Sequence, residues 1–133
     1  MARFTLSTDK SKVKPKELLK LWASVEWSGE NDYSPQTVKA AIKNTTLLVS
    51  ARNQYDELIG VARVMSDDIF ITWIGELIVH PDYQSLGVGK RLLKAVRDYY
   101  DNTSIVLETF TWNRKFFKKC GFKESKMLVF YNS

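Results

Sequence analysis

The chain has 133 residues, a length that suits one domain over residues 1–133 with one hydrophobic core. Hydrophobic residues make up 44% of it and aromatic residues 13%, a composition that excludes a disordered chain. No apolar run is long enough to span a membrane and the basic start lacks the apolar stretch of a signal peptide, so we expect a cytoplasmic protein without a membrane partner. The single cysteine, Cys120, excludes an internal disulfide and a cysteine-rich metal site.

The net charge of +5 raises the question of an anionic partner. Lysines are spread along the chain among acidic residues, without zinc-finger spacing or an RNA-binding aromatic signature. We therefore expect no nucleic-acid partner, although a small basic nucleic-acid-binding domain stays open as an alternative. A surplus of positive charge also suits a polyphosphate ligand, because it attracts the ligand from solution.

The first half of the chain predicts a strand, two helices and a pair of strands. Apolar residues recur at helical spacing after Lys14-Pro15, and proline is favoured at the first helical position. Ser34-Pro35 is a typical helix start, because the serine hydroxyl accepts a hydrogen bond from a first-turn N–H. The expected elements are a strand over Ala2–Ser7, a helix with apolar positions up to Val25, a loop over Trp27–Tyr33, a helix through Ile42, and strands over Thr46–Arg52 and Leu58–Met65.

The second half predicts a third strand that runs into a glycine-containing turn and a helix. Gly75 within this strand indicates a β-bulge or a close backbone approach. Strands, then a helical crossover, then a strand predict the α/β (α+β) class, with a mixed, mostly antiparallel central sheet flanked by helices. The expected elements are strands over Ile69–Val79 and Ser104–Phe110, helices over Val88 to about Tyr100 and Asn113–Lys119, and a last strand over Met127–Tyr131.

The turn over residues 84–90 is the most informative segment. Its glycines let the backbone approach a ligand, and the first helical N–H groups point outward at the positive end of the helix dipole. A pyrophosphate fits such a site. The turn is not a P-loop, which needs glycine where Gln84 stands and a hydroxyl where Arg91 stands. A dinucleotide-binding fingerprint needs a third glycine where Leu92 stands.

The pattern Gln84-x-x-Gly87-x-Gly89, after a strand that ends Val79-x-Pro81, resembles the acyl-CoA site of the GNAT superfamily of N-acetyltransferases. A second motif, Asn113 to Phe122, resembles that family's Asn-x-x-x-Tyr-x-x-x-Gly-Phe, with phenylalanine at the tyrosine position. The arrangement of Glu26-Trp27 before Tyr33-Ser34-Pro35 is similar to that of relatives in an arylalkylamine-acetyltransferase-like branch of the family. The resemblance implies the acyl-CoA N-acyltransferase (GNAT) fold.

The resemblance also implies how acetyl-CoA binds. Main-chain groups of the strand before the turn hold the pantetheine arm, backbone N–H groups of the turn hold the pyrophosphate, and an asparagine reaches the pantetheine chain. The residues at these positions are Leu77, Val79, Gln84, Ser85, Leu86, Gly87, Val88, Gly89, Lys90, Asn113 and Phe117.

Acetyl transfer to an amine requires that the ammonium lose a proton before it attacks. Glu76 is the leading carboxylate, because it interrupts an apolar strand. Neighbouring strand residues face opposite sides, so Glu76 shares no face with Leu77 unless a bulge intervenes, and a bracing role is the alternative. Phe117 cannot donate a proton to the leaving thiolate, so either the thiolate leaves unassisted or through water, or Tyr33, Tyr131 or another donor substitutes.

The sequence therefore predicts an acyltransferase that moves an acetyl group from acetyl-CoA to a primary amine by direct attack on the thioester, without a metal. The acceptor is a small-molecule or peptide amine. Aromatic residues near the expected first helix and third strand favour an aromatic or aliphatic amine. A non-catalytic acyl-CoA-binding module is the other alternative, and the apolar Met127–Tyr131 suggests a homodimer.

Overall fold

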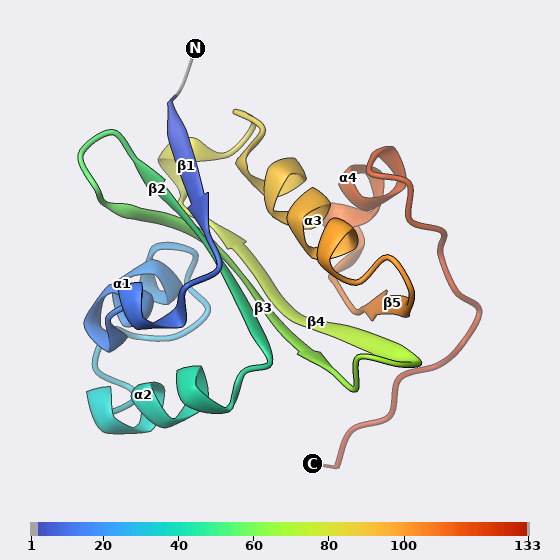
Figure 1. The fold of residues 1–133 in the computed structure, drawn as a ribbon, viewed down its shortest axis with the longest axis horizontal. Coiled ribbons are helices and arrows are strands. Elements are labelled where there is room, and N and C mark those ends of the chain that lie inside the picture. The colour runs from blue at the N-terminus through green and yellow to red at the C-terminus, as the bar shows by residue number, and fades with distance from the viewer. Residues whose placement is uncertain (1–2, 133) are drawn as a thin grey trace.

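The computed structural model describes residues 3–132, and its centre is a five-stranded sheet in the order β1-β2-β3-β4-β5 (Figure 1). The first three pairings are antiparallel and the β4–β5 pairing is parallel, as a helical crossover requires. The predicted mixed, mostly antiparallel sheet is confirmed. The strands are β1 (Phe4–Ser7), β2 (Leu47–Asn53), β3 (Leu58–Ser66), β4 (Ile71–Val79) and β5 (Ser104–Leu107).

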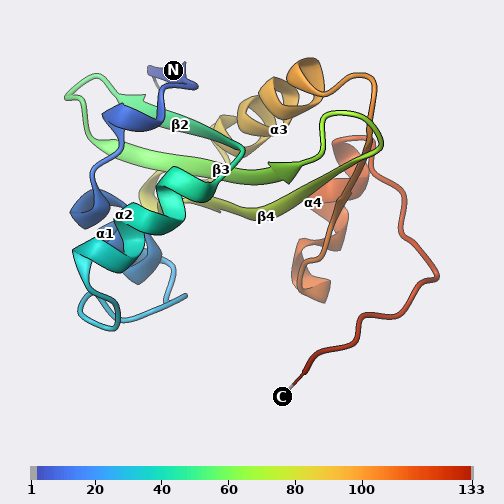
Figure 2. The same ribbon diagram turned by 60° about the horizontal axis from the view of Figure 1, so that its bottom comes forward.

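Helices cover both faces of this sheet. Helices α1 and α2 lie on one face, and α3 lies on the other with α4 beside it (Figures 1 and 2). The predicted cap is confirmed, since the Ser34 hydroxyl accepts from the Thr37 N–H at 3.1 Å. The helices are α1 (Pro15–Ser24), α2 (Pro35–Asn44), α3 (Val88–Tyr99) and α4 (Arg114–Lys119), and short 3₁₀ turns are η1 (Lys10–Lys12), η2 (Pro81–Tyr83) and η3 (Thr111–Asn113).

Two hydrophobic clusters fill the two layers. Because strand side chains alternate, neighbours such as Leu48 and Val49 of β2 enter different clusters. The central strands are thus buried on both faces, which explains their nearly continuous apolar sequences. The α1–α2 cluster contains Leu18, Leu19, Trp22, Val38, Ile42, Leu48, Val61 and Ile78, and the α3 cluster contains Val49, Ala62, Val64, Ile74, Val88, Leu92, Leu93 and Val96.

The β-bulge expected at Gly75 is present. Arg63 of β3 is opposite Glu76, whereas the next residue, Val64, is opposite Ile74, so Gly75 is the extra residue on β4. The bulge reverses the alternation along β4. Ile74 before it packs in the α3 cluster, and Ile78 after it packs in the α1–α2 cluster.

Several element ends differ from the prediction. β4 begins at Ile71 rather than Ile69, because Asp67 Oδ1 accepts hydrogen bonds from the N–H groups of residues 69–71 and fixes a loop there. β5 ends at Leu107 rather than Phe110, and the chain then forms η3. The first strand begins at Phe4, and Ala2 lies outside the described residues.

The predicted last strand over Met127–Tyr131 is wrong. Residues 122–132 follow an irregular path without a strand partner, although their sequence is as apolar as that of a strand. The Tyr131 hydroxyl donates to Glu108 Oε2 at 2.6 Å, which ties this segment to the residue that follows β5. Apolar composition alone does not make a strand, because a strand also needs an edge to pair with.

Candidate acyl-CoA site

The site begins where β4 and β5 stop pairing. Parallel pairing covers Ile71–Ile74 of β4 and ends opposite Leu107, so the rest of β4 lies beyond the paired stretch. The His80 N–H donates to the Ile59 carbonyl at 2.8 Å, which shows that even-numbered residues here direct their main-chain groups toward β3. In an antiparallel strand the neighbouring residues direct theirs the other way. The main-chain groups of Leu77 and Val79 therefore face the side of β4 that β5 has left.

The turn after β4 is held in place by its own residues. Gln84 Nε2 donates to the Val79 carbonyl at 3.0 Å, which fastens the turn to the end of the strand. Ser85 and Gly87 both have left-handed backbones, with φ of 67° and 88°. Gly87 precedes α3, so the left-handed residue directs the chain into the helix.

The start of α3 presents free backbone donors. Its first intrahelical bond runs from the Arg91 N–H to the Gly87 carbonyl at 3.0 Å, so the N–H groups of Val88, Gly89 and Lys90 precede the helical ladder. Leu86 and Lys90 are exposed beside them. These donors lie at the residues for which the sequence predicts an anion site, and that site stays a prediction.

Helix α4 lies against the same turn through Phe116. A Cβ built on Gly89 would lie 3.1 Å from Phe116 Cζ and 3.7 Å from Val79 Cγ2. A side chain at position 89 would therefore press on the Phe116 ring, so glycine there eases the close approach of α3 and α4, a role separate from the backbone freedom needed at Gly87. Glycine is therefore favoured at the two positions of the motif for different physical reasons.

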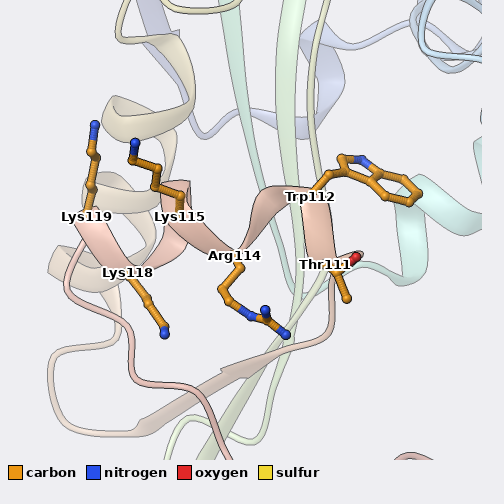
Figure 3. A pocket seen from close by; sticks show the side chains of 6 residues that line it. All are labelled: Thr111, Trp112, Arg114, Lys115, Lys118 and Lys119. Carbon is orange, nitrogen blue, oxygen red and sulfur yellow. The ribbon is translucent and has the colours of Figure 1, made fainter.

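Basic side chains flank this region on α4. An open hollow of about 620 Å³ lies over η3 and α4, not over the N-terminus of α3. In Figure 3, Lys115 and Lys119 point to one side of α4, and Arg114 and Lys118 point to the other. Arg114 and Lys118 both pair with Glu124, at 3.3 and 3.5 Å. The positive charge of Lys115 and Lys119 suits an approaching polyphosphate.

The second motif is positioned by packing rather than by polar contacts. Phe117 is half-buried and packs edge-on against Phe116 and Phe122, with ring centroids 5.1 and 6.0 Å apart. Asn113 Nδ2 donates to Thr109 Oγ1 at 3.0 Å. The aromatic position is thus used as part of the α3 cluster, and its side chain carries no group that can donate a proton.

Glu76 lies on the opposite face of the sheet from these residues. Its Oε2 accepts from the Trp22 indole at 2.6 Å and its Oε1 pairs with Arg63 Nε at 2.6 Å, while only 8% of the residue is exposed. The bulge precedes Glu76, so Glu76 and Leu77 still face opposite sides. Both carboxylate oxygens are occupied, which fits the bracing role.

Tyr33 belongs to an aromatic group on the same face as Glu76. Its ring meets Trp22 edge-on with centroids 6.3 Å apart, and Trp27 lies 4.8 Å from Trp22. Trp27 and Tyr33 are exposed, whereas Trp22 is buried over Glu76. The structure thus places Leu77, Val79 and residues 84–90 at the β4–α3 junction. Asn113 and Phe117 lie on η3 and α4, and the predicted catalytic residues, Glu76 and Tyr33, lie across the sheet from the junction.

Sequence reasoning missed three contacts at this site. Arg63 as the partner of Glu76, the Trp22 indole as a second partner, and the Gln84 side chain on the Val79 carbonyl all depend on the fold. Of these residues only Gln84 was indicated by the sequence, because it belongs to the first motif, but the motif does not show which group its side chain contacts. Within residues 3–132 no group of three or more His, Cys, Asp or Glu side chains is arranged to hold a metal, and no helix there is long and apolar enough to cross a membrane.

Comparison with known sequences agrees with the motif. Residues 16–122 match the model of the acetyltransferase (GNAT) family. The chain is 34% identical over 113 residues to an uncharacterized N-acetyltransferase, ycf52, of Pyropia yezoensis, covering 80% of this chain and 63% of that protein. It is also 34% identical over 77 residues to the chloroplastic GCN5-related N-acetyltransferase 3 of Arabidopsis thaliana, covering 53% and 31%. The chain thus spans less than two thirds of these relatives.

Comparison with solved structures agrees with the fold. A probable acetyltransferase of unknown function from methicillin-resistant Staphylococcus aureus superposes with a TM-score of 0.80 at 18% identity, over 97% of this chain and all of that one. A GNAT family protein from Streptococcus pneumoniae gives 0.76 at 21%, over 99% and 98%. The sheet, the crossover helix and the motif positions all lie within the matched residues, and the chain belongs to the acetyltransferase (GNAT) family.

Proposed function

We propose that the protein transfers an acetyl group from acetyl-CoA to a primary amine. One observation carries this proposal: the main-chain groups of Leu77 and Val79 face the side of β4 that β5 has left, and the free N–H groups at the start of α3 lie just beyond the turn that follows Val79. An amide-containing arm pairs with a strand edge as a peptide does, and a diphosphate suits the helix start. The residues present therefore fit the donor.

In the proposed reaction, the amine nitrogen attacks the thioester carbonyl carbon. The new C–N bond forms, the C–S bond breaks, and the ammonium proton goes to water. A main-chain N–H near Leu77 or Val79 stabilises the developing oxyanion. The thiolate, with an ordinary pKa of about 8.5, leaves without an acid from Phe117 or takes its proton through water.

Glu76 acts as a brace in this proposal. Its carboxylate is engaged by both Arg63 and Trp22, so service as a base requires that one partner be displaced. Tyr33, with an exposed ring beside Trp22, stays the candidate donor on the acceptor side.

The acceptor side favours a cationic aromatic amine. Between Lys20 and Lys39 the chain has no lysine or arginine but carries Glu26, Glu30 and Asp32, in a chain with an excess of five positive charges. The exposed rings of Trp27 and Tyr33 lie in the same loop. Acidic groups attract an ammonium and aromatic faces pack against an apolar ring.

A cytoplasmic location, a single domain over 1–133 and a homodimer also stay predictions. One similar protein is named chloroplastic, so its compartment differs from the one we expect here.

Calorimetry with CoA and mass spectrometry of an amine panel test the proposal. We expect saturable CoA binding that Gly89→Leu abolishes, because a side chain there collides with Phe116. We expect acetylated tryptamine-like amines in preference to lysine-tailed peptides. Absence of CoA binding by the folded protein would overturn the donor site, and preference for the peptides would overturn the acceptor assignment alone.

The non-catalytic acyl-CoA-binding module is favoured by one observation, the phenyl ring of Phe117 at the tyrosine position. A free-thiol assay across the same panel separates the two functions. Release of CoA supports the transferase, whereas CoA binding without thiol release from any amine supports the module.

A further inference from the structure

The positive charge of the molecule is concentrated on and around α4. Although lysines occur along the whole chain, residues 109–123 contain five basic and no acidic residues, so the charge of this stretch equals the +5 of the entire chain. Four of the five lie on α4 itself and form two pairs, each with a spacing of four residues: Arg114 with Lys118, and Lys115 with Lys119. Like charges at this spacing lie close together and destabilise a helix, and a helix as short as α4 has little stability of its own. An anion beside each pair offsets this repulsion.

Only one of the two pairs meets an anion within the described part of the chain. Arg114 and Lys118 share the carboxylate of Glu124, whose Oε2 lies 3.3 Å and 3.5 Å from their nitrogen atoms. Lys115 and Lys119 are exposed, and neither forms an ion pair within residues 3–132. Figure 3 shows that their side chains point away from those of Arg114 and Lys118. The Lys115–Lys119 pair therefore suits an anion that comes from outside the chain.

The ring of Phe116 connects this lysine pair to the candidate donor site. Lys119 follows Phe116 by three positions, so the two side chains are neighbours on the surface of α4. Phe116 Cζ lies 3.1 Å from the position of a Cβ built on Gly89, in the first turn of α3. Lys90, which is also exposed, adds a third positive charge at that turn. An anion between Lys115 and Lys119 would thus lie beside the N–H groups that we propose for the diphosphate.

The chemistry of the proposed donor identifies this anion. CoA has a further phosphate on the 3′ oxygen of its ribose, and only the ribose separates that phosphate from the diphosphate. A phosphomonoester carries about two negative charges at pH 7 and has several acceptor oxygens, so it can pair with two ammonium groups at once.

We propose that Lys115 and Lys119 bind the 3′-phosphate of CoA and thereby select this carrier over one that lacks the 3′-phosphate. The inference rests on the proposed function, because the phosphate belongs to the acetyl donor. It assigns the two pairs on α4 different roles, since Glu124 neutralises Arg114 and Lys118 whereas the ligand neutralises Lys115 and Lys119.

Dephospho-CoA, which lacks only the 3′-phosphate, provides the direct test. In calorimetry at low salt, the full chain should bind CoA about tenfold more tightly than dephospho-CoA, because exposed ion pairs are individually weak and two of them act together. Added salt should reduce this preference, since it screens exposed charges. Lys115→Gln combined with Lys119→Gln should remove the preference by weakening CoA binding and leaving the affinity for dephospho-CoA unchanged.

Arg114→Gln combined with Lys118→Gln is the matched control. It removes the same formal charge from the other side of α4, so it should change the ratio of the two dissociation constants less than about twofold. Equal binding of both carriers by the parent, or an equal effect of the two double variants on the ratio, overturns the inference and leaves the proposed function standing. A folded parent that binds neither carrier overturns both.

Phosphorus NMR of bound CoA provides a second measurement. Two nearby ammonium groups favour the dianion, so the pKa of the 3′-phosphate should be lower in the complex with the parent than in free CoA. In the complex with the Lys115→Gln, Lys119→Gln variant, that pKa should return toward the value of free CoA. An unshifted pKa in the parent complex would contradict direct pairing with the two lysines.

Discussion

The two faces of the sheet carry candidate sites of different construction. On the α3 face, the candidate donor site consists of main-chain groups of Leu77, Val79 and the helix start, with glycines that let a ligand or a neighbour approach. On the α1–α2 face, the candidate acceptor site consists of side chains: Trp22, Glu76 and Arg63 in one connected group.

This difference explains why the main-chain site can be predicted from the sequence, and why the side-chain site can change its ligand. A main-chain site depends on residue spacing and tolerates most side chains, so many sequences can keep the same donor site. A side-chain site depends on which residues the fold brings together, so it can change its ligand without disturbing the sheet. We expect changes on the two faces to separate into effects on donor affinity and effects on stability or acceptor choice.

The largest expected effect comes from Glu76→Gln. The substitution leaves the Arg63 guanidinium beside a neutral group in a largely buried position, and breaking such a pair costs about 3 kcal/mol of unfolding free energy. Urea unfolding measures the change. The double variant Arg63→Met with Glu76→Leu should recover much of it. If Glu76→Gln instead keeps full stability and removes the acid limb of the pH–rate profile, Glu76 is a base and not a brace.

Substitutions at Gly87 should affect the candidate donor site on the α3 face of the sheet. A β-branched side chain in a left-handed conformation costs about 1–2 kcal/mol, so Gly87→Val should weaken CoA binding about tenfold by displacing the turn. Gly87→Asn is the matched control, because asparagine tolerates this conformation. Calorimetry should show the asparagine variant close to the parent. Equal losses in both variants would contradict the conformational explanation, since space around the new Cβ is open.

Trp22→Phe should have a smaller effect, confined to the α1–α2 face. Phenylalanine keeps an aromatic ring but removes the indole N–H that donates to Glu76. The unfolding free energy should fall by about 1–2 kcal/mol, as for a lost hydrogen bond to a charged group. CoA affinity, measured in parallel, should stay unchanged. A tenfold loss of CoA affinity would show that the two faces are coupled.

The smallest expected effect is on pH dependence through Glu17. The hydrogen bond from Arg52, which fastens α1 to β2, lowers the pKa of the Glu17 carboxyl below its ordinary 4.5. A carboxyl whose pKa is lowered in the folded state stabilises that state at pH values above its ordinary pKa. This stabilisation is lost as the pH falls through the folded-state pKa. In Glu17→Gln the unfolding free energy at pH 7 should fall by less than about 1 kcal/mol, and its decline below pH 4.5 should be shallower. A decline as steep as in the parent would contradict the pair's role.

Sequence patterns predicted much of this fold because its signals are local. The serine–proline start of α2, the bulge at Gly75 and the range of α3 each depend on residues close in sequence. The predicted donor-site positions followed from motif spacing for the same reason, and the structure places those from Leu77 to Lys90 at one junction.

What sequence did not predict depends on distant partners. Trp22 and Glu76 are 54 positions apart, so no local pattern joins them. The run Met127–Tyr131 has strand-like composition but finds no edge within its own chain, and a strand is defined by its partner.

The early end of β4–β5 pairing has a consequence for how two reactants meet. A fully paired sheet separates molecules that are bound to its two faces. Because the pairing stops at Ile74 and Leu107, the rest of β4 has no neighbour on that side, and its side chains alternate between the two faces of the sheet. If the donor binds on the α3 side and the acceptor on the α1 side, as proposed, the two can meet at this stretch of β4 without the closing of a lid.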